Sequence, residues 1–169
     1  MRKPRLKPDY QDSWHHLYNR TAGTRDDRPF ADADKEMMVR ILKRVCRLYT
    51  VSVVSYQFMS NHFHIIAQSP KAIPSEEETC RRFGAFHGGK KILAPGTPLC
   101  RQWQLRLRDV SWFVRHFEHL FTLWFNRTRR IPRRGGLWAG RFKNTVLQDG
   151  AALWNALAYV ETTPGGRAW

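Results

Sequence analysis

The chain lacks the sequence features that mark several common protein classes. In its 169 residues no apolar run reaches the about 18 residues of a membrane helix, and no apolar core follows the basic start. We therefore expect a cytoplasmic protein without a membrane span or a secretory signal. The three cysteines, Cys46, Cys80 and Cys100, have spacings that match neither a zinc site nor a disulfide framework, which predicts free thiols. Walker loops, dinucleotide-binding glycine motifs and serine nucleophile elbows are also missing.

Acidic residues are scarce as well. The chain has 14 Asp and Glu against 29 Lys and Arg, a formal net charge of +15. Such an excess on a small domain attracts polyanions and is typical of nucleic-acid binding, although anionic membranes or solubility also account for it. Between Arg101 and Gln148, 11 basic residues occur with only 2 acidic ones, and Trp and Phe lie among them. This segment can pair phosphates and stack bases.

The basic segment supplies the candidate DNA contacts. Arginine pairs flank a proline beside a Gly-rich turn, and the chain continues into an Arg-Phe-Lys strand. A solvated charge run is the alternative for the arginine pairs, but beside a glycine turn we favour phosphate binding. The predicted DNA-binding residues are Arg127, Arg129, Arg130, Arg133, Arg134, Arg141 and Lys143.

Hydrophobic periodicity predicts one α+β domain over residues 1–169. Apolar residues recur at three and four over 32–48 and 110–127, which predicts two amphipathic helices, the first with Asp32 or Asp34 near its N-cap. Runs of β-branched and aromatic residues predict strands at 13–20, 50–58, 61–68 and 137–147, and a last helix at 151–163. This order predicts a ferredoxin-like layer sandwich: a four-stranded antiparallel sheet, helices on one face, and a C-terminal helix carrying Tyr159.

Residues 70–109 break this pattern. Prolines and glycines are frequent there, and a short acidic run at 76–78 is the only sign of a brief helix. We predict an irregular insertion or a mobile flap.

The sequence His62-Phe63-His64 is the most informative local motif. Side chains alternate between the faces of a strand, so both imidazoles project from one face while Phe63 points into the core. Two histidines make half of a metal site, which a third ligand or substrate oxygens must complete. Exposed polar alternation is the competing interpretation of an isolated pair.

The remaining histidines carry weaker signals. His116 and His119 lie three residues apart on the second helix, and we expect them to contact solvent or phosphate. His15, His16 and His87 are expected to be structural or on the surface. Taken alone, Tyr159 in its apolar helix is typical of a core residue.

Three sequence blocks occur in a fixed order. They are Met-Ser-Asn-His-Phe-His-Ile-Ile at 59–66, Gly-Leu-Trp-Ala-Gly-Arg-Phe-Lys at 136–143 and Ala-Tyr-Val-Glu-Thr-Thr-Pro at 158–164. On these blocks the chain resembles the HUH single-tyrosine transposases, most closely the REP-associated tyrosine transposases. The resemblance covers roughly residues 13–69 and 110–168 and leaves 70–109 outside it.

The resemblance implies cleavage and rejoining of single-stranded DNA, at or near a hairpin. Tyr159 would attack the scissile phosphorus, leaving a free 3′-hydroxyl and a 5′-phosphotyrosine intermediate. A divalent ion, Mg²⁺ or Mn²⁺, would lie at His62 and His64 and polarise a phosphate oxygen. No membrane partner is implied, and both a monomer and a dimer are compatible with the sequence.

One position departs from the family pattern. The family has Asn directly before the proline, one helical turn beyond the tyrosine, where this chain has Thr163. A hydroxyl is a weaker ligand than an amide carbonyl, so Thr163 predicts a low metal affinity or a contact through water. The alternative function is therefore a catalytically weak or inactive single-stranded nucleic-acid-binding domain. A metal-dependent hydrolase using water would need a carboxylate base near the histidines, and the sequence indicates none.

Overall fold

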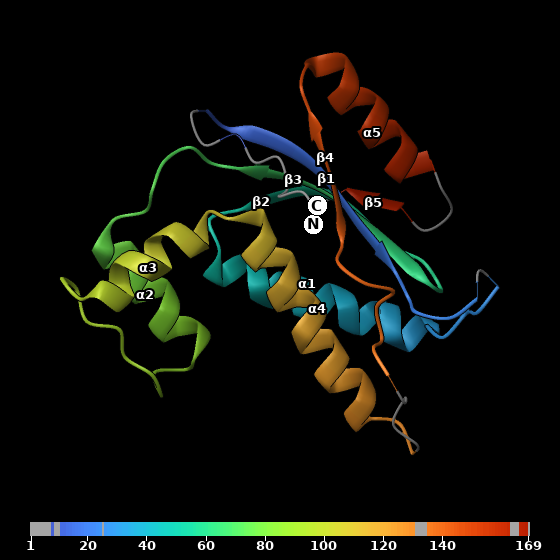
Figure 1. Cartoon of the computed structure of the whole chain (residues 1–169), viewed down its shortest axis with the longest axis horizontal. Helices are drawn as coiled ribbons and strands as arrows, with labels where there is room; N and C mark the ends of the chain where they lie inside the picture. The colour runs from blue at the N-terminus through green and yellow to red at the C-terminus, as the bar shows by residue number, and fades with distance from the viewer. Residues whose placement is uncertain (1–7, 9–10, 25, 131–134, 163–165, 169) are drawn as a thin grey trace, which may run out of the picture.

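A computed structural model describes residues 8, 11–24, 26–130, 135–162 and 166–168, and its elements are drawn in Figure 1. The strands are β1 Ser13–Arg20, β2 Ser52–Phe58, β3 His62–Ser69, β4 Lys143–Leu147 and β5 Gly166–Ala168. The helices are α1 Asp32–Leu48, α2 Glu76–Phe86, α3 Pro98–Leu107, α4 Val110–Arg127 and α5 Gly150–Thr162.

The strands form one sheet in the order β4-β1-β3-β2-β5, and every neighbouring pair is antiparallel. The predicted α+β class and antiparallel sheet are confirmed, and the short β5 adds a fifth strand to the four that were predicted. Strand β3 lies at the centre of the sheet, between β1 and β2. The His62-Phe63-His64 motif is therefore held by hydrogen-bonded neighbours on both sides.

The two faces of the sheet have different partners. Helices α1 and α4 lie together on one side, and α5 lies on the other (Figure 1). Phe63 is fully buried on the α1/α4 side and packs edge-on against Phe117 of α4 at 5.4 Å between ring centroids. Since strand side chains alternate, His62 and His64 project to the opposite face, toward α5.

The cap of helix α1 lies one residue before the first of the two predicted positions. The N-cap is Ala31, and Asp34 at the third helical position accepts a hydrogen bond from the Ala31 backbone nitrogen at 2.9 Å. The prediction that Asp32 or Asp34 lies near the N-cap is thus confirmed, and Asp34 reaches back to the cap from inside the first turn.

Residues 70–109 are not irregular, contrary to the prediction. They contain α2 and α3, whose N-caps Ser75 and Thr97 accept hydrogen bonds from the backbones of Glu78 and Cys100. The two helices enclose a small core of their own, made of Phe83, Leu93 and Cys100. The prolines and glycines mark the ends of these helices instead of an unstructured flap. The three cysteines are free thiols, with Cys80 and Cys100 sulfurs 3.7 Å apart.

The predicted fourth strand is shorter in the structure. Pairing with β1 begins at Lys143, and upstream of it a single bridge joins Trp138 to Thr21. Between them, Asn19 donates hydrogen bonds to the Gly140 carbonyl at 3.1 Å and to a Glu118 carboxylate oxygen at 2.6 Å. These contacts hold the segment before β4 beside the end of β1. In the described part of the chain, no helix has the length and apolar character to cross a membrane.

Candidate active site

The paired histidines lie where the alternation predicts them. Their ring centroids are 5.1 Å apart and the rings are nearly perpendicular, at 89°. The turn before them is fixed by the backbone: Asn61 O accepts from Thr21 N, and Ser60 O accepts from Phe30 N. The motif is therefore presented by a central strand and an anchored turn, which fixes the direction of both imidazoles.

Both imidazoles use their Nδ1 atoms in hydrogen bonds within the protein. His62 Nδ1 donates to the Asn61 side-chain oxygen at 2.7 Å. His64 Nδ1 lies 2.8 Å from Nε2 of His16 on β1. Metal-binding histidines commonly have one ring nitrogen held in this way while the other binds the ion. Nε2 is thus the nitrogen that each ring has for a metal.

The site keeps its histidines neutral. Burial, together with the neighbouring His16 and His62, lowers the pKa of His64 to about 4. Burial also lowers the pKa of His62, with a further contribution from the Arg28 guanidinium. Metal binding requires the neutral imidazole. Because their pKa values are lowered, these rings are already neutral at pH 7 and need not lose a proton to bind an ion.

Two tyrosines lie against His64. Tyr159 of α5 places its ring 5.4 Å from the His64 ring and 6.3 Å from the His16 ring, and is 54% exposed. Tyr18 of β1 pairs with His64 across the sheet, and its ring lies nearly parallel to the imidazole at 5.7 Å. The fold thus brings a phenol from the distant α5 to the histidine pair.

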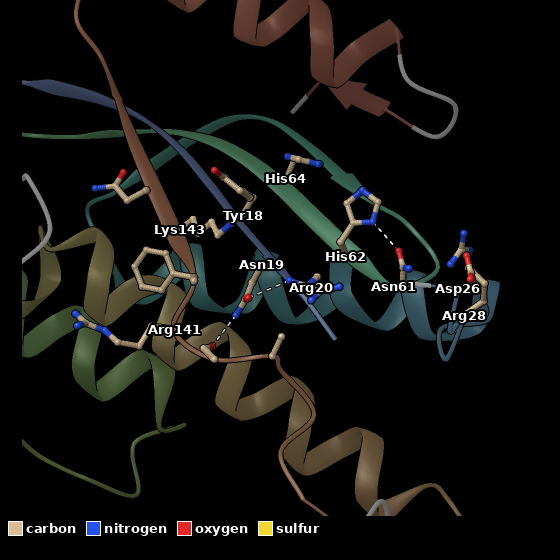
Figure 2. A pocket seen from close by; sticks show the side chains of 14 residues that line it. Tyr18, Asn19, Arg20, Asp26, Arg28, Asn61, His62, His64, Arg141 and Lys143 are labelled. Atoms are coloured by element: carbon tan, nitrogen blue, oxygen red, sulfur yellow. Dashed lines mark hydrogen bonds between the residues drawn. The ribbon is translucent and has the colours of Figure 1, made fainter. Parts of the chain in front are cut away.

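A cleft of about 1200 Å³ opens beside the histidines. Figure 2 shows the residues around it, which come from β1, the loop after β1, the β2–β3 turn and the segment leading into β4. One carboxylate, that of Asp26, lines the cleft together with four cationic side chains: Arg20, Arg28, Arg141 and Lys143. A phosphodiester chain would find net positive charge there, next to His62 and His64.

The donor set supports a partial metal site. Among the residues that the structure describes, no three His, Cys, Asp or Glu side chains are placed to share one metal ion. The predicted third ligand, Thr163, lies outside the described residues. Two neutral imidazoles with fixed Nδ1 atoms fit a divalent ion whose other ligands are oxygens from substrate and water.

Comparison with known proteins finds a similar fold in a solved structure but no similar sequence. No protein-family model matches the sequence, and neither does any curated protein. The chain is similar to a solved structure of a REP-associated tyrosine transposase bound to a REP hairpin, with a TM-score of 0.58. The match covers 97% of this chain and 72% of that chain. Their fold is shared. At 12% sequence identity, the solved transposase supports the predicted family at the level of fold alone.

The predicted basic residues are distributed over different environments. Arg141 and Lys143 are exposed and line the cleft. Arg127 and Arg130 are exposed at and beyond the end of α4, the helix that packs on the other face of the sheet. Two further predicted contacts, Arg133 and Arg134, lie outside the described residues.

Arg129 has a partner within the fold. Its Nη2 donates to both carboxylate oxygens of Asp34 at 2.7 Å, and its guanidinium lies over the Phe125 ring, 4.1 Å from the centroid. Asp34 is 2% exposed. These contacts favour a role in joining α1 to the end of α4, and leave the predicted DNA contact of Arg129 without support from the geometry.

Sequence reasoning missed four residues of the site. His16 and Tyr18 contact His64, while Arg20 and Arg28 line the cleft. Alternation along β1 places His16, Tyr18 and Arg20 on one face, which was the available signal, but only the register of β1 on β3 brings that face to His64. His16, which was expected to be structural or on the surface, thus contacts a candidate metal ligand.

His116 does not point to solvent as expected. Its Nδ1 lies 3.3 Å from the Tyr49 hydroxyl, and its ring packs against Phe86. Burial, together with the neighbouring His119, His87 and Arg44, lowers its pKa to about 4. His116 therefore joins α4 to α1 and α2, away from the candidate site.

Proposed function

We propose that this protein is a metal-dependent single-stranded DNA endonuclease and strand transferase that forms a 5′-phosphotyrosine intermediate, at or near a DNA hairpin. The observation that carries the proposal is the approach of Tyr159 to His64, 5.4 Å between ring centroids, beside a cationic cleft. The fold shared with the solved transposase, whose structure holds a REP hairpin, supports the same choice.

In the proposed reaction, the Tyr159 oxygen attacks the scissile phosphorus. The phosphorus–O3′ bond breaks, the 3′ oxygen takes up a proton, and the phenol proton passes to solvent. The DNA 5′ end remains on the protein as a phosphotyrosine diester, so the bond energy is retained and a second strand's 3′-hydroxyl can reverse the step without ATP.

The residues of the cleft would bind and orient the strand. Arg20, Arg28, Arg141 and Lys143 supply positive charge for phosphates on either side of the scissile bond. Tyr18 offers an aromatic face within the same cleft, on which a base can stack. His62 and His64 would hold Mg²⁺ or Mn²⁺, and the ion would supply polarisation of a nonbridging phosphate oxygen.

A second candidate is a binding domain without turnover. The observation in its favour is that the described residues offer two histidines and no third side chain for a metal ion. Such a protein would bind hairpin-bearing single strands with the same cationic cleft and form no covalent product.

The test uses hairpin-bearing single strands labelled at one end. After incubation with Mn²⁺ and denaturation, the 3′ label should migrate with the protein, whereas the 5′ label should appear on a shorter free strand. Tyr159→Phe should abolish the adduct and keep DNA affinity within about twofold, because it removes only the attacking oxygen.

Tyr18→Phe is the matched control, since Tyr18 is the other phenol beside His64. It should keep the adduct, because a phenylalanine ring still stacks. Binding with no adduct from the wild-type protein, in Mg²⁺ and in Mn²⁺, would favour the binding domain instead.

A further inference from the structure

His16 contacts the candidate metal ligand His64 and has no role in the proposed reaction as described so far. It lies on β1, directly across from Ile66, on the face of the sheet that carries His64. Its Nε2 is 2.8 Å from His64 Nδ1, and the ring centroids are 5.0 Å apart. The contact is a hydrogen bond between two imidazoles, held by paired neighbouring strands.

Such a bond contains one proton, and its position decides what His64 can do. If His64 Nδ1 donates, then the neutral His64 ring has a lone pair on Nε2 and can bind a metal ion. If His16 Nε2 donates instead, His64 carries its proton on Nε2, and that atom cannot ligate. The two proton positions give the same distance between the nitrogen atoms, but only the first leaves His64 able to bind a metal ion.

The two candidate ligands differ in how this choice is made. His62 donates to the Asn61 side-chain oxygen, which only accepts, so its proton is fixed on Nδ1. The partner of His64 is an imidazole, which accepts only when its own proton is on the other nitrogen. The tautomer of His16 therefore decides whether His64, like His62, carries its proton on Nδ1.

We propose that His16 is a positioning residue that accepts a hydrogen bond from His64 Nδ1 and thereby holds His64 in the tautomer that binds a divalent ion through Nε2. The inference rests on the proposed function in assigning His62 and His64 to a metal. His16 itself is not placed as a third ligand, since the described residues contain no such set of three.

The first experiment needs no substitution. Long-range ¹H–¹⁵N correlation spectra of the metal-free protein report which nitrogen of each histidine carries the proton. The expected result is a proton on Nδ1 for both His62 and His64, and on Nδ1 for His16. A proton on Nε2 of His64 overturns the inference, whether or not the protein cleaves DNA.

The second experiment measures Mn²⁺ affinity by electron paramagnetic resonance, with a non-cleavable single-stranded hairpin oligonucleotide present. His16→Phe keeps a ring and removes the acceptor, so the affinity should fall roughly 10- to 100-fold. His16→Gln offers an acceptor oxygen and should recover most of the loss. His119→Gln, on the exposed face of α4, serves as the control and should match the wild type.

The outcomes separate the two proposals. Equal Mn²⁺ affinity of wild type and His16→Phe contradicts the role of His16 while leaving the metal intact. A cobalt(II) spectrum that loses a nitrogen ligand in His16→Gln makes His16 a direct ligand and also overturns the inference. If the wild-type protein binds no Mn²⁺, the metal part of the proposed function fails, and the tautomer spectra still decide the role of His16.

Discussion

At the scale of single residues, the ion pair between Arg129 and Asp34 gives the clearest stability prediction. Removing the guanidinium leaves a carboxylate that is almost fully buried without its cationic partner. Arg129→Ala should therefore lower the free energy of unfolding by about 1–3 kcal/mol, measured by urea denaturation. Arg130→Ala is the matched control, because its side chain is exposed, and it should stay within about 0.5 kcal/mol of wild type. Equal effects of the two substitutions would contradict a structural role for Arg129.

A second residue-scale prediction concerns pH and His116. Its folded-state pKa of about 4 lies below the ordinary histidine value of 6.5, so the unfolded chain takes up a proton in this window and the folded chain does not. Stability is therefore fully present above pH 6.5 and falls as the pH drops toward 4. The histidines of the site, the buried His64 and the half-buried His16 and His62, act in the same direction because their pKa values are also lowered.

Urea midpoints across this pH range check the assignment to His116. His116→Gln should reduce the pH dependence of the unfolding free energy, since glutamine has no proton to take up in the unfolded chain. The exposed neighbour His119 offers a comparison, and His119→Gln should leave most of the dependence in place. If His116→Gln left the pH dependence unchanged, the other buried histidines would have to account for all of it.

At the scale of helices and strands, Arg82 holds the α2–α3 unit on the rest of the fold. Its Nη1 donates to the Tyr49 carbonyl at 2.9 Å and to the Arg47 carbonyl at 3.2 Å, both at the end of α1. Arg82→Ala should release α2 and α3 from α1 and raise their amide hydrogen exchange roughly tenfold, with β3 unchanged. Arg81 pairs with the same Glu78 carboxylate and makes no such contact with α1 among the described residues. Faster exchange in Arg81→Ala as well would show that the Glu78 pairing, and not the contact with α1, holds α2.

The helices and strands were predictable to different degrees. β1, α1 and α4 begin and end where the periodicity predicts, because each presents an uninterrupted apolar face to one core. β4 was predicted too long. Residues 137–142 have a strand-like composition, but they meet β1 through a single bridge, and the Asn19 side chain binds the Gly140 carbonyl. The acidic run at 76–78 marked the start of α2, but the full length of α2 was not predicted and α3 was missed. Prolines and glycines that end helices cannot be told apart by composition from those in loops.

The candidate site was also predictable only in part. Alternation along one strand was enough to place His62 and His64 on one face. The contacts of His64 with His16 and Tyr18 depend on how β1 pairs with β3, and a one-residue slip would send both to the other face. Such register is a tertiary property that a single strand's sequence does not contain.

At the scale of the whole molecule, the cleft predicts a salt dependence that other basic surfaces do not share. Replacing Arg20, Arg28, Arg141 and Lys143 with alanine should flatten the fall of log K with log salt on single strands, by about 0.7 for every phosphate that the variant no longer neutralises. The control variant loses the same number of charges from the exposed face of α1, on the other side of the sheet. Its substitutions to alanine are at Arg40, Lys43, Arg44 and Arg47. If the cleft variant kept the wild-type salt dependence and the control variant lost part of it, DNA would bind on the α1 side, away from the histidines.

The most direct test of the central claim is to identify the residue that carries the DNA. The wild-type protein is incubated with a hairpin-bearing single strand and Mn²⁺, digested with nuclease and protease, and its peptides are sequenced by mass spectrometry. We expect a nucleotide linked through its 5′ phosphate to Tyr159. Tyr56 is excluded as the nucleophile by its burial in the core, at 6% exposed, but Tyr18 also lies beside His64. A nucleotide on Tyr18, or no modified tyrosine in a sample that has cleaved the strand, would show that Tyr159 is not the nucleophile.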